Sequence, residues 1–444
     1  MSAEKKVRRQ PPPASRSLDS APIWWVIAAF AILIPLFYAP AGSDGFRLPK
    51  ELLLRAEAIL IVAVCATIAL TRGVRTLTAM LPPKRTSLLV GTIAVWSMLA
   101  CTLSTNRPLS VLAVEYTIAA IIVFLGTYAA VRERALQPVV IVATVGAIPN
   151  AILAFTQATS VWNPFHFDAA LPVHVRTSAL MGNANDVGGY LMVVMLMSGV
   201  AALASHNRWW WSVTAILLVG VFASQSLTAM ISAGAGFTAL ACLLPKRKKI
   251  LGFAAIIVVV ALAISTAGPM RQRLNYLRTA WRNRDYSELT SERIFPAVTA
   301  WAMFTDHPLT GIGPGTFKFH YLDYRRAFNE RHPWAYLASL ENFGQVHSDH
   351  LQILSEEGLP GYMLFIAALL AIGSASLKHG GDDHRDDDRA DPRPRFVRLG
   401  ALPLALSFGI LTLAAFPLET AAATQLALHF AAAVLAWNNS GEGA

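Results

Sequence analysis

Residues 186–205 read Asp-Val-Gly-Gly-Tyr-Leu-Met-Val-Val-Met-Leu-Met-Ser-Gly-Val-Ala-Ala-Leu-Ala-Ser, with one charged residue in twenty. A helix of about 20 apolar residues is long enough to cross the hydrocarbon core of a bilayer. Stretches of this kind recur along the chain, and they predict about twelve transmembrane helices, near 23–40, 52–70, 87–103, 109–131, 137–159, 186–205, 209–224, 226–244, 250–268, 359–377, 397–416 and 418–437. We therefore expect an all-α polytopic membrane protein.

The composition of the 444-residue chain excludes a soluble globule, because 55% of the residues are hydrophobic and 14% are charged, with a mean hydropathy of +0.47. The apolar runs are continuous rather than alternating, which excludes a transmembrane β-barrel. The formal net charge of +10 comes from short loops between apolar runs, so it gives no indication of a nucleic-acid partner. Cys65, Cys101 and Cys242 lie inside apolar runs and imply neither a disulfide framework nor a thiolate metal site.

The distribution of basic residues predicts the orientation in the membrane. With a cytoplasmic N-terminus, 21 Lys and Arg fall on cytoplasmic segments, and the short loops on the opposite side carry four, namely Arg47, Lys50, Arg107 and Arg176. Such a bias is typical of the positive-inside rule. No small-residue cleavage site follows the first apolar run, so we interpret that run as an uncleaved anchor in a bacterial inner membrane.

This topology predicts five segments. They are a basic, Pro-rich cytoplasmic tail (1–22), nine transmembrane helices (23–268), one large periplasmic loop with short helices (269–358), three transmembrane helices (359–437) and a cytoplasmic tail (438–444). The loop is far longer than a connection between two helices requires. We therefore expect it to carry the function.

The first half of the loop predicts two helices. In the first, residues 270–282, Leu274, Leu277 and Trp281 share one face, as is typical of a helix on a membrane surface. The second, residues 291–304, has Ser291 as its expected N-cap and Pro296 in its early turns.

Arg293 stands at the start of the second helix. Its guanidinium is suited to a diphosphate group. A surface salt bridge with Glu292 or Glu288 is an equally weighted alternative.

Three glycines follow, Gly311, Gly313 and Gly315, in Gly-Ile-Gly-Pro-Gly-Thr-Phe317. Glycine permits tight turns and close backbone approach. The segment lacks the strand-and-helix context of a dinucleotide-binding fingerprint. We interpret it as a structural turn.

The end of the loop predicts a short helix that runs from Ser348 to a C-cap at Gly358. His347 lies at its mouth and His350 one turn further, and an imidazole here could accept a proton from an attacking hydroxyl near neutral pH. A metal site built from both histidines is an alternative, although their i, i+3 spacing differs from the i, i+4 spacing of H-E-x-x-H. An ordinary hydrogen-bonding surface is a third interpretation.

The glycine segment and His347-Ser-Asp-His-Leu-Gln-Ile-Leu-Ser-Glu-Glu-Gly358, in this order, closely resemble the G-x-G-x-G-x-F and H-N-x-x-L-x-x-x-x-E-x-G patterns of the O-antigen ligase and polymerase superfamily. Arg176 with Gly182-Asn-Ala-Asn185 resembles a segment of that family in which an Arg is followed by N-x-N. Phe416-Pro-Leu418 resembles the short apolar corner that precedes the family's last span. By motif, the resemblance covers roughly residues 170–437.

The resemblance implies an inverting glycosyltransferase that needs no metal or other cofactor and uses a polyisoprenyl-diphosphate-linked glycan, such as one on undecaprenyl diphosphate, as donor. It implies that His347 is the catalytic residue that engages the acceptor hydroxyl, and that Arg293 and Arg176 bind the diphosphate. It also suggests supporting roles for a further set of residues, His350, Asn183, Asn185, Gly313, Gly315 and Glu357.

The sequence departs from the family pattern at two positions. Ser348 replaces the usual Asn after the histidine, and Leu227 stands where an S-R segment of the family has arginine. A third cationic ligand is therefore missing or is supplied from elsewhere in the chain.

Several functions fit this sequence. We expect an O-antigen ligase, whose acceptor is the lipid A-core of lipopolysaccharide. A polymerase that extends a growing glycan on the same carrier is the alternative, and Leu227 slightly favours it. A protein O-oligosaccharyltransferase and a polysaccharide transporter with intramembrane charges at Arg55, Glu57 and Glu115 are minor alternatives.

Overall fold

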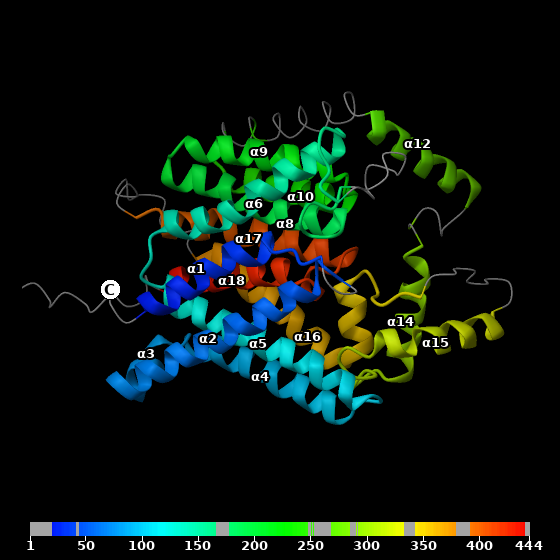
Figure 1. The fold of residues 1–444 in the computed structure, drawn as a ribbon, viewed down its shortest axis with the longest axis horizontal. Helices are drawn as coiled ribbons and strands as arrows, with labels where there is room; N and C mark the ends of the chain where they lie inside the picture. Colours follow the sequence, from blue (N-terminus) through cyan, green and yellow to red (C-terminus); the bar gives the residue numbers. More distant parts are fainter. Residues whose placement is uncertain are drawn as a thin grey trace, which may run out of the picture.

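A computed structural model describes residues 20–40, 44–165, 177–246, 250, 252, 268–284, 290, 292–332, 342–378 and 391–439. All of the regular secondary structure in this described part is helical, and it contains no strands (Figure 1). The helices are α1 (Ala21–Leu36), α2 (Leu48–Arg72), α3 (Val74–Met80), α4 (Lys84–Thr102), α5 (Arg107–Val131), α6 (Leu136–Ala158), α8 (Ala184–Ser205), α9 (Trp209–Ser224), α10 (Leu227–Leu243), α12 (Gly268–Asn283), α14 (Ile294–Asp306), α15 (Phe317–Arg331), α16 (Asp349–Lys378), α17 (Arg393–Leu413), the 3-10 helix η2 (Pro417–Glu419) and α18 (Ala421–Asn439).

Seven of these helices, α2, α4, α5, α6, α8, α16 and α17, are long and apolar enough to cross a membrane. The predicted spans coincide with them and with four others: α1, α9 and α10, which are apolar but only 16 or 17 residues long, and α18. The predicted span 250–268 lies almost entirely outside the described residues. The count of twelve therefore stays a prediction, whereas the all-helical class is confirmed.

Helix α8 lies at the centre of the bundle. In its most apolar window 94% of the residues are buried, against 28% in α2 and α5. Small residues allow its neighbours to approach closely. A Cβ on Gly188 would lie 2.7 Å from Ser224 Oγ of α9, and one on Gly189 would lie 3.0 Å from Leu411 of α17. Helix α8 is predominantly apolar on all of its faces, as is typical of a helix enclosed by other helices.

The other helices form two groups around this centre. Helices α6, α9 and α10 lie on one side of the bundle, α2, α4 and α5 lie on the other, and α1, α17 and α18 lie between them (Figure 1). Helix α5 contacts α2, α4 and α18, and α16 contacts both α4 and α17. A space can therefore be enclosed between the side group α2, α4 and α5 and the neighbouring helices α16, α17 and α18.

Helices α14 and α15 lie at one end of the bundle, opposite the start of α1 (Figure 1). They have a small core of their own, made by Phe295, Met303, Ile312, Phe317 and Tyr321. The helix predicted at 270–282 is present as α12, and its place on a membrane surface stays a prediction, whereas α15 and the short α3 were not predicted.

The predicted helix 291–304 begins later than expected, at Ile294, with Arg293 in the N-cap position. The prediction of Ser291 as N-cap is wrong. The hydroxyl of Thr290 instead accepts a hydrogen bond from the amide of Ile294, at 3.2 Å. Two adjacent hydroxyl residues precede this helix, so the sequence pattern alone did not separate them.

Helix α16 joins the end that carries α14 and α15 to the bundle, since it contacts both α14 and α17. Gly358 interrupts it with a φ of +69°, as the predicted C-cap implies, and the chain then continues helically to Lys378. A side chain at Gly358 would lie 2.5 Å from Leu309 O. The break therefore lets the segment around Leu309 pack directly against α16.

The close packing of α10 gives a test of the bundle. Gly236→Ala places a methyl group 2.1 Å from Ser407 Oγ and 2.7 Å from Leu196, so we expect a loss of about 1–3 kcal/mol of stability from overpacking. Gly234→Ala is the matched control, since nothing lies within 4 Å of its Cβ. Thermal unfolding in detergent should show a lower midpoint for Gly236→Ala alone, and equal midpoints would contradict the packing described.

Candidate active site

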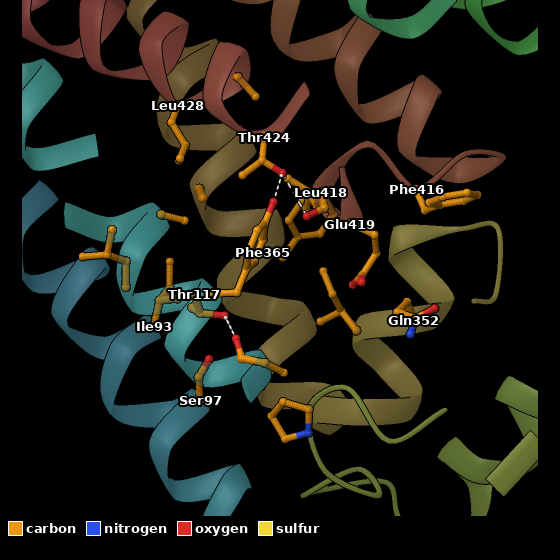
Figure 2. A pocket seen from close by; sticks show the side chains of 18 of the residues that line it. Ile93, Ser97, Thr117, Gln352, Phe365, Phe416, Leu418, Glu419, Thr424 and Leu428 are labelled. Atoms are coloured by element: carbon orange, nitrogen blue, oxygen red, sulfur yellow. Dashed lines mark hydrogen bonds between the residues drawn. The ribbon is translucent and has the colours of Figure 1, made fainter. Parts of the chain in front are cut away.

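One large cavity, of about 1430 Å³, lies among α2, α4, α5, α16, α17 and α18 (Figure 2). Its wall is polar where these helices meet the loops before α16 and α18. His347, Gln345, Arg47, Gln352 and Glu419 all line this polar end.

Much of the remaining cavity wall is apolar and runs along the helices into the bundle, although Arg55, Arg85 and Glu115 also line it. Leu52 of α2, Ile93 of α4, Phe124 of α5, Phe408 of α17 and Leu435 of α18 contribute to it. Leu435 lies near the end of α18, and Leu418 lies before its start, so the cavity follows most of that helix. A cavity of this shape can accept an elongated ligand with a hydrocarbon tail and a polar head.

His347 is held at the polar end in a backbone conformation that only a few non-glycine residues adopt, with φ at +60°. Its ring packs edge-on against Phe416, with centroids 4.8 Å apart, and against Phe343 at 5.9 Å. Such strain is commonly retained at functional sites.

The surroundings of His347 keep its imidazole neutral. Burial, followed by the positive charges of Arg293 and Arg47, lowers the pKa of His347 to about 4. Within the described residues the ring makes no hydrogen bond. A neutral imidazole can accept a hydrogen bond from a hydroxyl group in the cavity.

Arg47, at the start of α2, supplies a cation to the site that sequence analysis did not assign. Its Nη2 lies 3.1 Å from Asp186 Oδ2 and its Nη1 donates to Gln345 Oε1 at 3.0 Å. The guanidinium lies 4.9 Å from the centre of the Phe416 ring. The only signal in the sequence was its place among the few basic residues on the predicted periplasmic side.

Arg293 lies close to His347 and to the segment that leads to Phe416. Its Nη1 donates to Ala414 O at 2.6 Å, two residues before Phe416, and its charge acts on His347. Arg293 is not one of the residues that line the cavity itself. Arg176, the other predicted diphosphate ligand, lies outside the described residues.

The predicted asparagines tie two helices together. Asn183 lines the cavity and caps α8, with its Oδ1 accepting the amide of Asn185 at 2.7 Å. Asn185 Oδ1 in turn accepts a hydrogen bond from Ser226, the N-cap of α10, at 2.8 Å. Leu227 follows at the first position of α10 and does not line the cavity.

The three loop glycines form the tight turn that was predicted, because Gly311, Gly313 and Gly315 have φ values of +64°, +113° and +71°. Added side chains would lie 2.0 Å from Ser104 at Gly313 and 2.9 Å from Ala113 at Gly315. The turn is thereby pressed against α5 and the loop that precedes it.

Glu356 of α16 fixes this turn. Its Oε2 accepts the amide of Gly315 at 2.7 Å, and its Oε1 accepts the amide of Phe317 at 2.9 Å and the side chain of Gln352 at 2.9 Å. Gln352 Oε1 accepts the amide of Val346, next to His347, at 2.8 Å. This network, rather than Glu357, therefore links the glycine turn to His347.

Glu357 and His350 have other partners. Ser97 of α4 donates to Glu357 at 3.3 Å, and Glu357 lines the cavity. His350 Nδ1 lies 3.1 Å from the Tyr362 hydroxyl, and its Nε2 lies 3.0 Å from Thr412 Oγ1, so His350 contributes to packing against α17 and does not converge with His347. In the described part of the chain, no three His, Cys, Asp or Glu side chains are grouped to hold a metal ion.

The fold is helical with seven helices able to cross a membrane, and His347 lies with Arg47 at the polar end of a large cavity, with Arg293 close by. Residues 212–366 match the family model described as O-antigen ligase. The match spans Arg293, the glycine turn, His347 and Glu356, and it confirms the resemblance to the O-antigen ligase superfamily. A search of curated proteins finds no significant match.

The role of Glu356 can be tested without substrate. Glu356→Gln replaces one acceptor oxygen by an amide group that faces N–H donors, so we expect a cost of about 1–3 kcal/mol at the turn. Hydrogen–deuterium exchange of the 311–317 amides should become faster. Glu357→Gln is the matched neighbour, and equal exchange in the two variants would contradict the proposed network.

Proposed function

We propose that this protein transfers a glycan from a polyisoprenyl diphosphate, such as undecaprenyl diphosphate, to a hydroxyl group of an acceptor at the bacterial inner membrane. The family match gives the coarser class, a membrane glycosyltransferase of the O-antigen ligase or polymerase type. The observation that carries the finer proposal is the continuous cavity, in which a cationic end with His347 opens directly into a long apolar wall.

The donor fits this cavity in one direction. The isoprenoid chain lies along α4, α5, α16 and α18, where it is shielded from water, and its diphosphate lies at the polar end near Arg47 and Arg293. Arginine can bind phosphate oxygens through two parallel hydrogen bonds. We assign Arg47 as the cation that takes the place of the family arginine missing at Leu227. Arg176 is assigned as a further diphosphate ligand.

The reaction requires stabilisation of negative charge. An acceptor oxygen attacks the anomeric carbon, inverts it and releases the lipid diphosphate, on which charge grows as the bond breaks. Fixed arginines stabilise that charge in a site with little water, and no metal or other cofactor is required. His347, neutral near pH 7, binds the acceptor hydroxyl and orients its oxygen.

Among acceptors, we favour the lipid A-core of lipopolysaccharide, which makes the protein an O-antigen ligase. In the proposed topology, the loop with α14 and α15 is periplasmic, and both termini are cytoplasmic. The position of these helices opposite the start of α1 supports this topology (Figure 1). A polymerase that extends the carrier-linked glycan is the second candidate, supported by the absence of arginine at Leu227.

The role of His347 is tested by His347→Ala. Purified variant protein added to membranes from a host without the gene should transfer no glycan to lipopolysaccharide, although it inserts and accumulates normally. Arg293→Ala should lose most of the rate, because the leaving diphosphate loses a cation. His307→Ala, an exposed histidine in the same part of the chain, should keep the wild-type rate. Normal transfer by His347→Ala would refute this role.

Arg47 can be tested against the same assay. Arg47→Ala should lower the transfer rate ten- to a hundredfold, in line with about 1.5–3 kcal/mol for a hydrogen bond to a charged group. Because the substitution also leaves Asp186 unpaired and only 8% exposed, it is made together with Asp186→Asn as well as alone.

The matched control for charge is Arg326→Ala, whose side chain is 83% exposed on α15. Unchanged transfer by both Arg47 variants would remove Arg47 from the diphosphate site. Recovery of full activity in the double variant would mean that Arg47 only neutralises Asp186.

A further inference from the structure

Glu419 ends the 3-10 helix η2, directly before α18, and its carboxylate is directed into the cavity (Figure 2). Three residues earlier, Phe416 packs against His347 at 4.8 Å and lies under the guanidinium of Arg47 at 4.9 Å. The segment 416–419 is held in place, since the amide of Leu418 donates to Asp349 Oδ2 at 3.2 Å. Glu419 therefore belongs to the same polar end as His347.

Most other carboxylates that line the cavity are already engaged by the protein. Glu356 accepts three hydrogen bonds, Glu357 accepts from Ser97, and Glu51 pairs with Arg55 at 3.6 Å. Glu419 makes no hydrogen bond or ion pair through its carboxylate within the described residues. Its oxygens thus remain available to a ligand.

Glu115 is the other unengaged carboxylate of the cavity wall. It is exposed and lies about two turns into α5, away from the segment that carries Phe416 and Glu419. Glu419, in contrast, shares the influence of Arg47 with His347. Of the two, Glu419 is the one placed to act on a hydroxyl group beside His347.

The two residues differ in their strength as bases. A His347 with a pKa of about 4 is a weak base towards a sugar hydroxyl. Burial and then the charge of Glu51 raise the pKa of Glu419 above its ordinary value, while Arg47 and Lys318 act in the opposite direction. Glu356, Glu357 and Asp349 of α16 also feel the charge of Glu419. A general base works best when its pKa approaches the working pH.

We propose that Glu419 is the catalytic base of the transfer and that His347 orients the hydroxyl which Glu419 deprotonates. The acceptor O–H bond breaks and its proton moves to the Glu419 carboxylate. The oxygen forms a bond to the anomeric carbon, and the bond from that carbon to the phosphate oxygen breaks with its electron pair on the diphosphate. The inference rests on the proposed function, and it assigns the proton to a residue outside the 212–366 family match.

The test is the pH dependence of transfer, measured with purified protein and membranes from a host without the gene, which supply carrier-linked glycan and lipopolysaccharide. Since the base must be deprotonated, the wild-type rate should fall as the pH drops through a value above 4.5, the ordinary value for glutamic acid. If His347 were the base, the fall would be centred near pH 4.

Glu419→Gln should lower the rate by about a hundredfold or more, the usual contribution of a positioned base, and should abolish the fall above pH 4.5. Glu419→Asp should restore part of the rate together with a fall in rate at low pH. Glu330→Gln, a carboxylate whose side chain is 65% exposed on α15 and does not line the cavity, should keep both the rate and the profile.

Binding of undecaprenyl diphosphate separates this inference from the proposed function. Glu419→Gln should bind undecaprenyl diphosphate as tightly as wild type in a tryptophan-fluorescence titration. A wild-type rate in Glu419→Gln, an unchanged pH profile or a loss of this binding would each overturn the role as base. If wild type neither binds undecaprenyl diphosphate nor transfers glycan, the proposed function itself fails.

Discussion

The carboxylate of Glu356 connects the two parts of the chain on which the site depends. It accepts the amides of Gly315 and Phe317 from the glycine turn, and through Gln352 it holds the amide of Val346 beside His347. A buried carboxylate is costly unless its oxygens are hydrogen-bonded, so the turn and α16 stabilise one another. The strained backbone of His347 lies between Val346, whose amide donates to Gln352, and Ser348, whose carbonyl accepts the amide of Gln352, so both neighbours hold it in place.

The second constraint is the meeting of charge and hydrocarbon in one cavity. Arginines inside a helical bundle are expensive unless they are paired, and Arg47 is paired with Asp186 while Arg293 donates to Ala414 O. Both cations can therefore stay near His347 without a bound ligand. A lipid diphosphate completes the arrangement, because its chain continues along the apolar wall that begins at the same residues.

Much of the fold was predictable from the sequence, since apolar runs of bilayer length specify helices without regard to their partners. The glycine turn and the break at Gly358 were also predictable, because both need backbone conformations that favour glycine. Arg47 and Glu419 were not, since they come to the same cavity as His347 from the start of α2 and from η2, far away in sequence. Only packing brings them together, and no local spacing encodes it.

Central to the proposed function is the transfer of a finished, carrier-linked glycan to lipid A-core. It is tested most directly by a lipopolysaccharide gel of cells from which the gene has been deleted, combined with analysis of their carrier-linked glycan. We expect bare lipid A-core on the gel and long polymer accumulating on the carrier. Single repeat units in both places would indicate a polymerase instead, and an unchanged ladder without accumulation on the carrier would contradict the claim.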